Sequence, residues 1–388
     1  MHTAAPAAAP PPVRTPTAPR PRLAALDGLR FLAALFVVLY HYTAISDKHW
    51  RGQSPKDLFP HLHLVSAYGW MGVHLFFLIS GFVICMSSWD RRLGDFFTSR
   101  VVRLYPAYWF AVLAIAAVLI ISPVVRPAPT VHDILTNLTM LQEPIGARRV
   151  DGVFWTLWTE MKFYFLWALL LWKGLNYRSA IAFCLGWTVI TLIAAETGSQ
   201  LLTSAFATDY APFFIAGIAL YLTHRFKPTA LLWGIVAVSY LLAQQTTYVN
   251  YTRRLKDLGY HVPEWPVIVL LTAFFGVMAL LALGKLDWIR GAWLTTLGVT
   301  TYPLYLIHEN IGWTLIYHLA DRLPHAVLVG ALIVLMVITA WLIHQTVEKP
   351  FAPLLRTALK SSFDELRTRT TASDSHPSGP QPGRRKLD

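Results

Sequence analysis

The stretch LDGLRFLAALFVVLYHYTAI, residues 26–45, is apolar along most of its length but contains an arginine and a histidine. A membrane core needs about 20 mainly apolar residues per helix, which this stretch supplies. Ionisable side chains inside such a segment cost about 2.5–3.5 kcal/mol each on insertion scales, so they are rarely kept without a use. Arg30 and His41 are therefore candidate functional residues of a predicted membrane-spanning helix.

Arg30 and His41 are predicted to lie on one face of that helix. At about 100° per residue, the step from position 30 to position 41 is three turns plus about 20°. At a rise of about 1.5 Å per residue, the two side chains lie roughly 16 Å apart along the axis. Each residue alone is also explained as an interfacial side chain near one end of the span. Their shared face favours a functional stripe across the membrane.

The whole chain has the composition of a membrane protein. Of its 388 residues, 55% are hydrophobic and only 14% are charged, whereas soluble domains carry about 25% charged residues. We predict an all-α, polytopic integral membrane protein with about ten transmembrane helices. The expected spans are 28–46, 69–88, 104–122, 153–172, 179–196, 209–223, 229–245, 266–283, 292–316 and 326–346. They form a membrane domain over residues 23–352, between a disordered basic tail (1–22) and a mostly disordered cytoplasmic tail (353–388).

The distribution of basic residues predicts the orientation of the chain. With the N-terminus inside, the inner segments hold roughly twice as many Lys and Arg residues as the outer loops, as the positive-inside rule requires. We therefore expect a multi-pass protein of the cell membrane with both termini in the cytoplasm. Because the net charge of +12 lies in short loops and tails, nucleic-acid binding is not expected. No metal site is expected, since Cys85 and Cys184 lack ligand spacing and so do the histidines within any one helix. No permanently bound cofactor is expected either.

Several polar residues fall at a similar depth below the outer ends of their spans, about 7–10 Å at the rise of a helix. They are His41, His74, Glu160, His308 and Glu309. A carboxylate beside a histidine is the arrangement of a general base and the group that orients it. Structural hydrogen bonding between helices is the alternative explanation.

The inner layer is basic. Arg100 and Arg103, in FFTSRVVRLYPAYW at the start of the third span, are three residues apart and share a helix face. Arg30 belongs to the same layer. Two or three guanidinium groups at one place suit phosphate groups, although either Arg100 or Arg103 alone is also explained as a positive-inside anchor.

Motifs in the membrane domain occur in a definite order. They are LDGLRFLAALFVVLYH (26–41), GVHLFFLISGFVI (72–84), RVVR (100–103), WTLWTEMKFYFL (155–166), TYPLYLIHE (301–309) and VEKPF (347–351). With these motifs the chain resembles the bacterial membrane acyltransferase family 3, over nearly all of residues 25–352. This family comprises integral membrane O-acyltransferases of carbohydrates and glycosylated natural products. Many members have a second acidic residue where this chain has Met161.

The resemblance implies transfer of a short acyl group from cytoplasmic acyl-CoA to a hydroxyl. The acceptor would be a sugar on a glycosylated natural product, such as a macrolide antibiotic, or on a surface polysaccharide. We hypothesise that Arg30, Arg100 and Arg103 bind the CoA phosphates. His41 would be the general base, oriented by Glu160, with Arg30 counted among the catalytic residues. An acyl-histidine intermediate is the alternative to direct attack.

The other three polar residues, His74, His308 and Glu309, are expected on the acceptor side of the membrane. A secondary transporter with an intramembrane His/Glu proton relay is the alternative function. A transporter would favour an internal repeat and broken helices. No repeat is visible, although Gly81 and Pro303 are positions where a span could break. Binding of CoA would distinguish the two functions.

Overall fold

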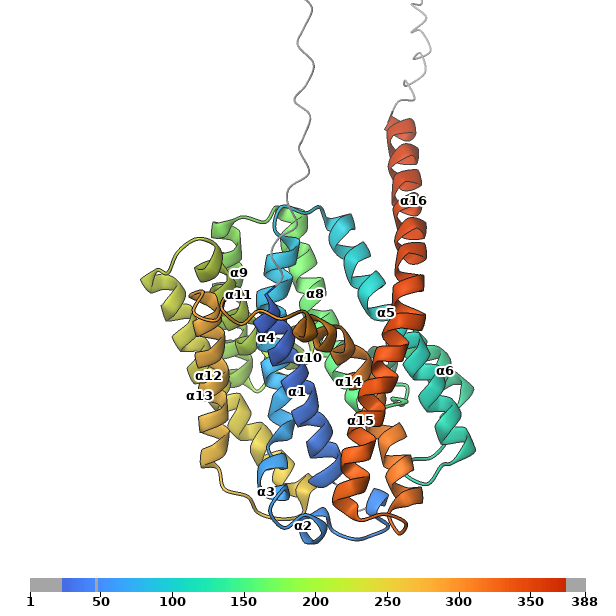
Figure 1. The fold of residues 1–388 in the computed structure, drawn as a ribbon. Helices are drawn as coiled ribbons and strands as arrows, with labels where there is room; N and C mark the ends of the chain where they lie inside the picture. The colour runs from blue at the N-terminus through green and yellow to red at the C-terminus, as the bar shows by residue number, and fades with distance from the viewer. Residues whose placement is uncertain (1–22, 46–47, 375–388) are drawn as a thin grey trace, which may run out of the picture.

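The computed structural model describes residues 23–45 and 48–374, and every regular element in them is a helix (Figure 1). The longer helices are α1 (Ala24–Thr43), α4 (Gly72–Ser88), α5 (Leu93–Ile121), α8 (Trp155–Lys173), α9 (Tyr177–Thr197), α11 (Ala211–Arg225), α12 (Ala230–Leu258), α13 (Trp265–Ala282), α14 (Ala292–Leu319), α15 (His325–Ile343) and α16 (Lys349–Asp374). Shorter elements lie between them: η1 (Lys48–Trp50), α2 (Pro55–Leu58), α3 (His63–Ser66), η2 (Gly69–Met71), α6 (Val131–Leu138), α7 (Gln142–Ile145), η3 (Gly152–Phe154), α10 (Gln200–Phe206) and the π-helical turn η4 (His344–Glu348).

Eight helical runs in the described chain are long and apolar enough to cross a membrane. The prediction of an all-α polytopic membrane protein is confirmed. The two expected spans outside these eight are 153–172 and 292–316, which correspond to α8 and α14. Both helices carry ionisable residues along their length, among them Glu160 in α8 and His308 in α14.

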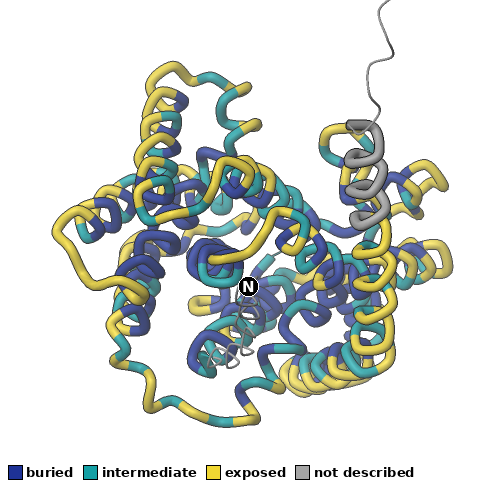
Figure 2. Tube along the Cα trace, turned by 90° about the horizontal axis from the view of Figure 1, so that it is seen from above, coloured by how far each residue is buried: buried dark blue, intermediate teal, exposed yellow. Residues whose placement is uncertain are grey.

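The centre of the bundle is built on α11 and α4. Every residue of α11 from Ala211 to Thr223 is buried, as expected of a helix that is apolar on all sides. Helix α4 packs on α11 and also on α1, and α1 in turn packs on α14. Seen from above in Figure 2, exposed positions lie on the periphery and buried ones face the interior. Arg30 and His41, which form the predicted stripe on α1, are half-buried in this arrangement.

Helices α4 and α11 meet at two glycines. A Cβ atom added at Gly81 would collide with the backbone carbonyl of Phe214, and one added at Gly217 would collide with that of Leu78. Small residues permit such close backbone contact between membrane helices. Gly81 lies inside the continuous helix α4, and Pro303 inside the continuous helix α14. The two positions where the sequence would permit a broken span do not interrupt a helix.

The C-terminal part of the chain is helical beyond the expected membrane domain. Helix α15 continues through η4 into α16, which packs on α5 and extends past the bundle (Figure 1). The segment 353–388, for which a mostly disordered tail was expected, is therefore helical as far as Asp374. The expected tail 1–22 lies outside the described residues. In Figure 1, α1 begins and α16 ends on the same side of the bundle, the upper side.

The contact at Gly217 predicts the effect of a larger side chain. Gly217→Val should lower the free energy of unfolding by about 1–3 kcal/mol, because the helices must separate to admit it. Thermal unfolding in detergent, followed by tryptophan fluorescence, measures this change. Gly276→Val is the matched control in α13, since no heavy atom lies within 4 Å of a Cβ added there. Equal unfolding midpoints for the two variants would contradict the close contact of α4 and α11.

Candidate active site

A small cavity of about 90 Å³ lies between α1, α4, α5, α8 and α14. Three guanidinium groups line it, those of Arg30, Arg100 and Arg103. The Glu160 carboxylate also lines it and accepts a hydrogen bond from the Ser80 hydroxyl. The structure thus brings together the three arginines that the sequence assigned to one inner layer. We call this the arginine cavity.

Glu160 lies elsewhere than the sequence predicted. It was expected in the layer of His41, as the group that orients the histidine, but it lines the arginine cavity. The physical reason is the start of α8. Val153 and Phe154, in the turn that precedes the helix, are buried at 3% and 0% exposure. The fourth span therefore begins inside the protein. The depth of Glu160 was counted from this turn as if the turn lay at the membrane surface, so the predicted depth is too small.

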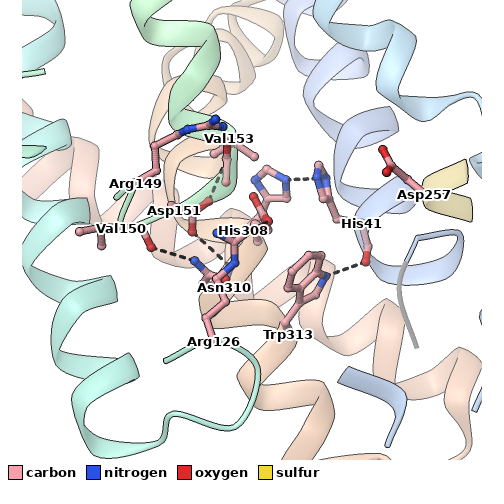
Figure 3. Close-up of polar contacts among 12 residues, drawn as sticks. His41, Arg126, Arg149, Val150, Asp151, Val153, Asp257, His308, Asn310 and Trp313 are labelled. Carbon is pink, nitrogen blue, oxygen red and sulfur yellow. Dashed lines mark hydrogen bonds and ion pairs between the residues drawn. The ribbon is translucent and has the colours of Figure 1, made fainter. Parts of the chain in front are cut away.

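The partner of His41 is His308, on α14. The His308 Nε2 and His41 Nδ1 atoms are 3.2 Å apart, and the ring centroids are 4.9 Å apart. Figure 3 shows the two rings facing each other from two different helices. Sequence analysis placed both residues at a similar depth. It did not identify them as a pair, because the contact depends on how α1 packs against α14.

Backbone carbonyls determine which nitrogen of each histidine carries the proton. His41 Nδ1 lies 2.8 Å from the Val37 carbonyl oxygen, and His308 Nδ1 lies 2.8 Å from that of Tyr305. A carbonyl only accepts, so each Nδ1 donates a proton to it and each Nε2 is left with a lone pair. In this assignment the single Nδ1 proton of His41 is shared between the Val37 carbonyl and His308 Nε2, and His41 Nε2 remains available as a base.

A larger cavity of about 520 Å³ lies beside His41, at the last turn of α1. We call it the outer cavity, after the side of the membrane to which the sequence analysis assigns His41. Its charged lining residues are Arg126, Arg149, Arg253, Arg254 and Asp257. None of the five was predicted from the sequence. Three of them belong to pairs of adjacent arginines, Arg148–Arg149 and Arg253–Arg254, in segments predicted to be outer loops, where the positive-inside rule disfavours basic residues.

Glu309 lies next to the carboxyl group of Asp151, a residue that was not predicted from the sequence. Arg126 donates to the Glu309 carboxylate at 3.1 Å. Asp151, fully buried, accepts from the backbone N–H of Val153 at 3.2 Å and of Asn310 at 3.3 Å (Figure 3). Burial and the neighbouring Glu309 charge raise the pKa of Asp151 well above its usual value. Asp151 precedes its helix, so a search for ionisable residues within spans passes over it.

His74 does not join the histidine pair. Its ring stacks on Phe213, with centroids 4.6 Å apart, and also contacts Trp70 and Tyr210. Trp70 and Tyr210 line the outer cavity, so His74 lies behind this aromatic wall. The sequence predicted that His74 belongs to the polar layer on the acceptor side. In the structure its side chain is buried, with 2% of its surface exposed, and it packs in the core.

The cavities follow one another through the bundle. The outer cavity and the arginine cavity share Val73 and Tyr305 in their linings. The arginine cavity shares Arg100, Leu104 and Tyr164 with a third cavity beside α16. Together they trace a path from the α16 side of the protein to His41. Within the described residues, no group of three or more His, Cys, Asp or Glu side chains could hold a metal ion.

Comparison with known proteins identifies the family. The model of the family described as "Acyltransferase domain" matches residues 23–345. Acyltransferase MdmB of Streptomyces mycarofaciens is 26% identical over 381 residues, covering 86% of this chain and 92% of that protein. Protein 2 in picA locus of Rhizobium radiobacter is 27% identical over 168 residues, covering 37% of this chain and 79% of that protein. No solved structure matches.

The family model covers more than half of the chain, and it includes α1 and α14 with both histidines of the pair. The resemblance found in the sequence motifs is thereby confirmed, and the chain belongs to the Acyltransferase domain family, the membrane acyltransferase family 3.

Proposed function

We propose that this membrane acyltransferase moves a short acyl group from acyl-CoA to a hydroxyl of a sugar-bearing acceptor. The observation that carries the proposal is the position of His41. It lines the outer cavity, which adjoins the cavity lined by Arg30, Arg100 and Arg103. A thioester that approaches from the arginines and a hydroxyl that enters from the other side would meet near its imidazole.

The chemistry follows from the tautomer of His41. The Nε2 lone pair takes the proton of the acceptor hydroxyl as the oxygen attacks the thioester carbonyl. The new C–O bond forms, the C–S bond breaks, and CoA leaves as a thiolate that receives the proton. While His41 carries the extra proton, its contact with the His308 Nε2 lone pair disperses the charge. His308 is thus a positioning residue, in the role that the sequence analysis gave to Glu160.

Glu160 has a different role in this proposal. Its carboxylate is the acidic group in the lining of a cavity that holds three guanidinium groups. It reduces their mutual repulsion and, with Ser80, helps to keep them in place. The arginines retain an excess of positive charge, which suits the phosphates of a CoA thioester.

The size of the outer cavity bears on the acceptor. Small-molecule pockets are about 300–1,000 Å³, and the outer cavity, at about 520 Å³, is in that range. A cavity of this size accommodates a single sugar unit with its attachment point outside. We therefore favour a sugar on a glycosylated natural product or on a lipid carrier over a polymer bound along its length.

The proposed orientation places the α16 side of the bundle in the cytoplasm, with both termini. That side carries Arg91, Arg92, Arg100 and Arg103 in and around the start of α5, in agreement with the positive-inside rule. Acyl-CoA would then enter from the cytoplasm and the acceptor from the opposite side. The transporter alternative is less well supported, because α4 and α14 are continuous helices where breaks would be expected.

A buried contact between Asp151 and Asn310 helps to hold His308 in its position beside His41, the proposed base. Asp151 accepts the backbone N–H of Asn310, and the Asn310 side chain donates to the Val150 carbonyl at 3.0 Å. These bonds tie α14, two residues after His308, to the loop that precedes α8. The position of His308 thus depends on a carboxyl group whose pKa is raised.

Replacement of the base tests the proposed function. His41→Ala should reduce acceptor-dependent CoA release by about 10²–10⁴-fold, the usual contribution of a general base. The measurement uses purified protein in nanodiscs with acetyl-CoA and a panel of sugars and glycosylated natural products. His318→Ala is the control, since His318 lies on α14 but is exposed and bonded to Ser122. Wild-type turnover in His41→Ala would rule out this mechanism.

The partner of the base should show a smaller effect of a different kind. His308→Ala should lower kcat by about 10–100-fold, the size of the loss seen when the hydrogen-bond partner that orients a metal-ligating histidine is removed. The KM for acyl-CoA should stay unchanged, because His308 is not among the residues that line the arginine cavity. His308→Gln, which retains a hydrogen-bonding group, should recover part of the activity. A raised KM with unchanged kcat would place His308 in donor binding instead.

The raised pKa of Asp151 predicts how stability depends on pH. A group whose pKa is higher in the folded than in the unfolded state contributes stability at low pH, and that contribution is lost as pH rises through the folded-state pKa. The unfolding midpoint should therefore fall between pH 5 and pH 8 by more in the wild type than in Asp151→Asn, whose side chain does not titrate. An identical fall of the unfolding midpoint in both proteins would contradict a raised pKa of Asp151.

A further inference from the structure

The third cavity lies between α5, α8 and α16 and has a volume of about 1000 Å³. Four basic side chains line it, those of Arg91, Arg92, Arg100 and Lys360. The first three belong to the start of α5 and the loop before it, whereas Lys360 comes from α16. Arg100 also lines the arginine cavity, but the chemistry proposed above uses neither the other three basic residues nor helix α16.

We propose that this cavity binds the phosphorylated nucleotide end of the acyl-CoA donor, and that α16 supplies Lys360 as one of its phosphate ligands. The inference rests on the proposed function, because it takes acyl-CoA to be the donor. It goes further by assigning a binding role to a helix beyond residues 23–345, the part of the chain that the family model matches.

The volumes of the two cavities indicate which end of the donor each cavity can bind. The arginine cavity, at about 90 Å³, is far smaller than the pockets of about 300–1,000 Å³ that hold whole small molecules. The bulky nucleotide must therefore remain outside it, and only the narrow acyl-pantetheine arm could extend into it. The adjoining cavity is large enough for a nucleotide and leads directly inward, since both cavities are lined by Arg100, Leu104 and Tyr164.

The charged residues that line the third cavity also suit the nucleotide end of the donor. The four basic side chains face two acidic ones, Asp90 and Asp95, and Asp90 forms an ion pair with Arg225 at 3.2 Å. The third cavity therefore keeps a positive excess, which suits the ribose phosphate of CoA. Arg100, which lines both this cavity and the arginine cavity, suits the diphosphate that joins the nucleotide to the pantetheine arm. The inner part of the third cavity is aromatic: the Arg100 guanidinium lies 5.9 Å from the Phe96 ring centroid and 6.0 Å from that of Tyr164. Stacked rings and guanidinium planes also suit an adenine base.

The placement of α16 is determined by the fold. The helix continues from α15 through η4 and packs against α5, so its backbone is held beside the cavity. Lys360 is exposed, three turns into the helix, and its side chain borders the cavity. Within the part of the chain that the structure describes, the Lys360 ammonium group forms no hydrogen bond or ion pair, so it can bind a phosphate without losing another contact.

The test compares two donors that differ only in the nucleotide. We would measure kcat/KM for acetyl-CoA and for acetyl-pantetheine, with full-length protein in phosphatidylcholine nanodiscs. Lys360→Glu should lower kcat/KM for acetyl-CoA by about tenfold, the effect of losing one charge-assisted phosphate contact. It should leave kcat/KM for acetyl-pantetheine unchanged. Arg356→Glu is the matched control, because this residue of α16 is exposed and outside the cavity lining.

Several results would overturn the inference. Equal losses for both donors would show that Lys360 acts through structure, and no loss for either would remove it from the donor site. A loss seen for both donors, and only in nanodiscs with anionic lipid, would make Lys360 a lipid anchor. If the wild type turned over neither donor, the proposed function would fail. Equilibrium binding of CoA would then decide the site, with a tenfold weaker affinity in Lys360→Glu supporting it and equal affinities refuting it.

Discussion

The pairing of α1 with α14 is the contact on which the site depends. Two hydrogen bonds join the helices at the histidines: the Tyr42 hydroxyl donates to the His308 carbonyl at 2.9 Å, and the Trp313 indole donates to the His41 carbonyl at 2.7 Å. Lipid offers no competing partner for these groups, so separating the helices would leave them unsatisfied. Because each bond ends on the backbone of a histidine, the same contact that holds the helices also fixes the two rings.

The contact between α4 and α11 has a complementary effect. Gly81 and Gly217 let these helices touch along their backbones, and α4 then presents Ser80 and Val73 toward α1 and α8. Ser80 binds Glu160, and Val73 lines both the arginine cavity and the outer cavity. A tight contact on one side of α4 thus leaves space on its other side, where the polar groups gather.

The sequence predicted the parts of the site that belong to single helices. The stripe of Arg30 and His41 on α1, and the arginine pair on α5, follow from helical spacing alone, and the structure places them along one path. The residues that were missed depend on other features. Asp151 and Arg126 lie in connecting segments whose positions depend on tertiary packing, so no periodicity marks them. The depth of Glu160 was misjudged because the turn before α8 is buried.

The helix α16 was missed for a different reason. Its sequence is polar and rich in Thr and Ser, a composition that also suits a disordered tail. What holds its first part in place is continuity with α15 and packing on α5, and neither is visible in the local sequence. Composition alone therefore separated this segment from the membrane domain, whereas the fold joins them.

Tyr305 connects the donor side of the site with the histidine pair. Its side chain lines both the arginine cavity and the outer cavity, and its hydroxyl shares a hydrogen bond of 3.0 Å with Thr156 on α8. Its carbonyl accepts the His308 Nδ1 proton, which leaves the His308 Nε2 lone pair facing His41. The side chain and the carbonyl of Tyr305 thus act at different places: the side chain lies between the two cavities, and the carbonyl orients His308. One turn of α14 therefore lines both cavities and fixes the orientation of the histidine that contacts His41.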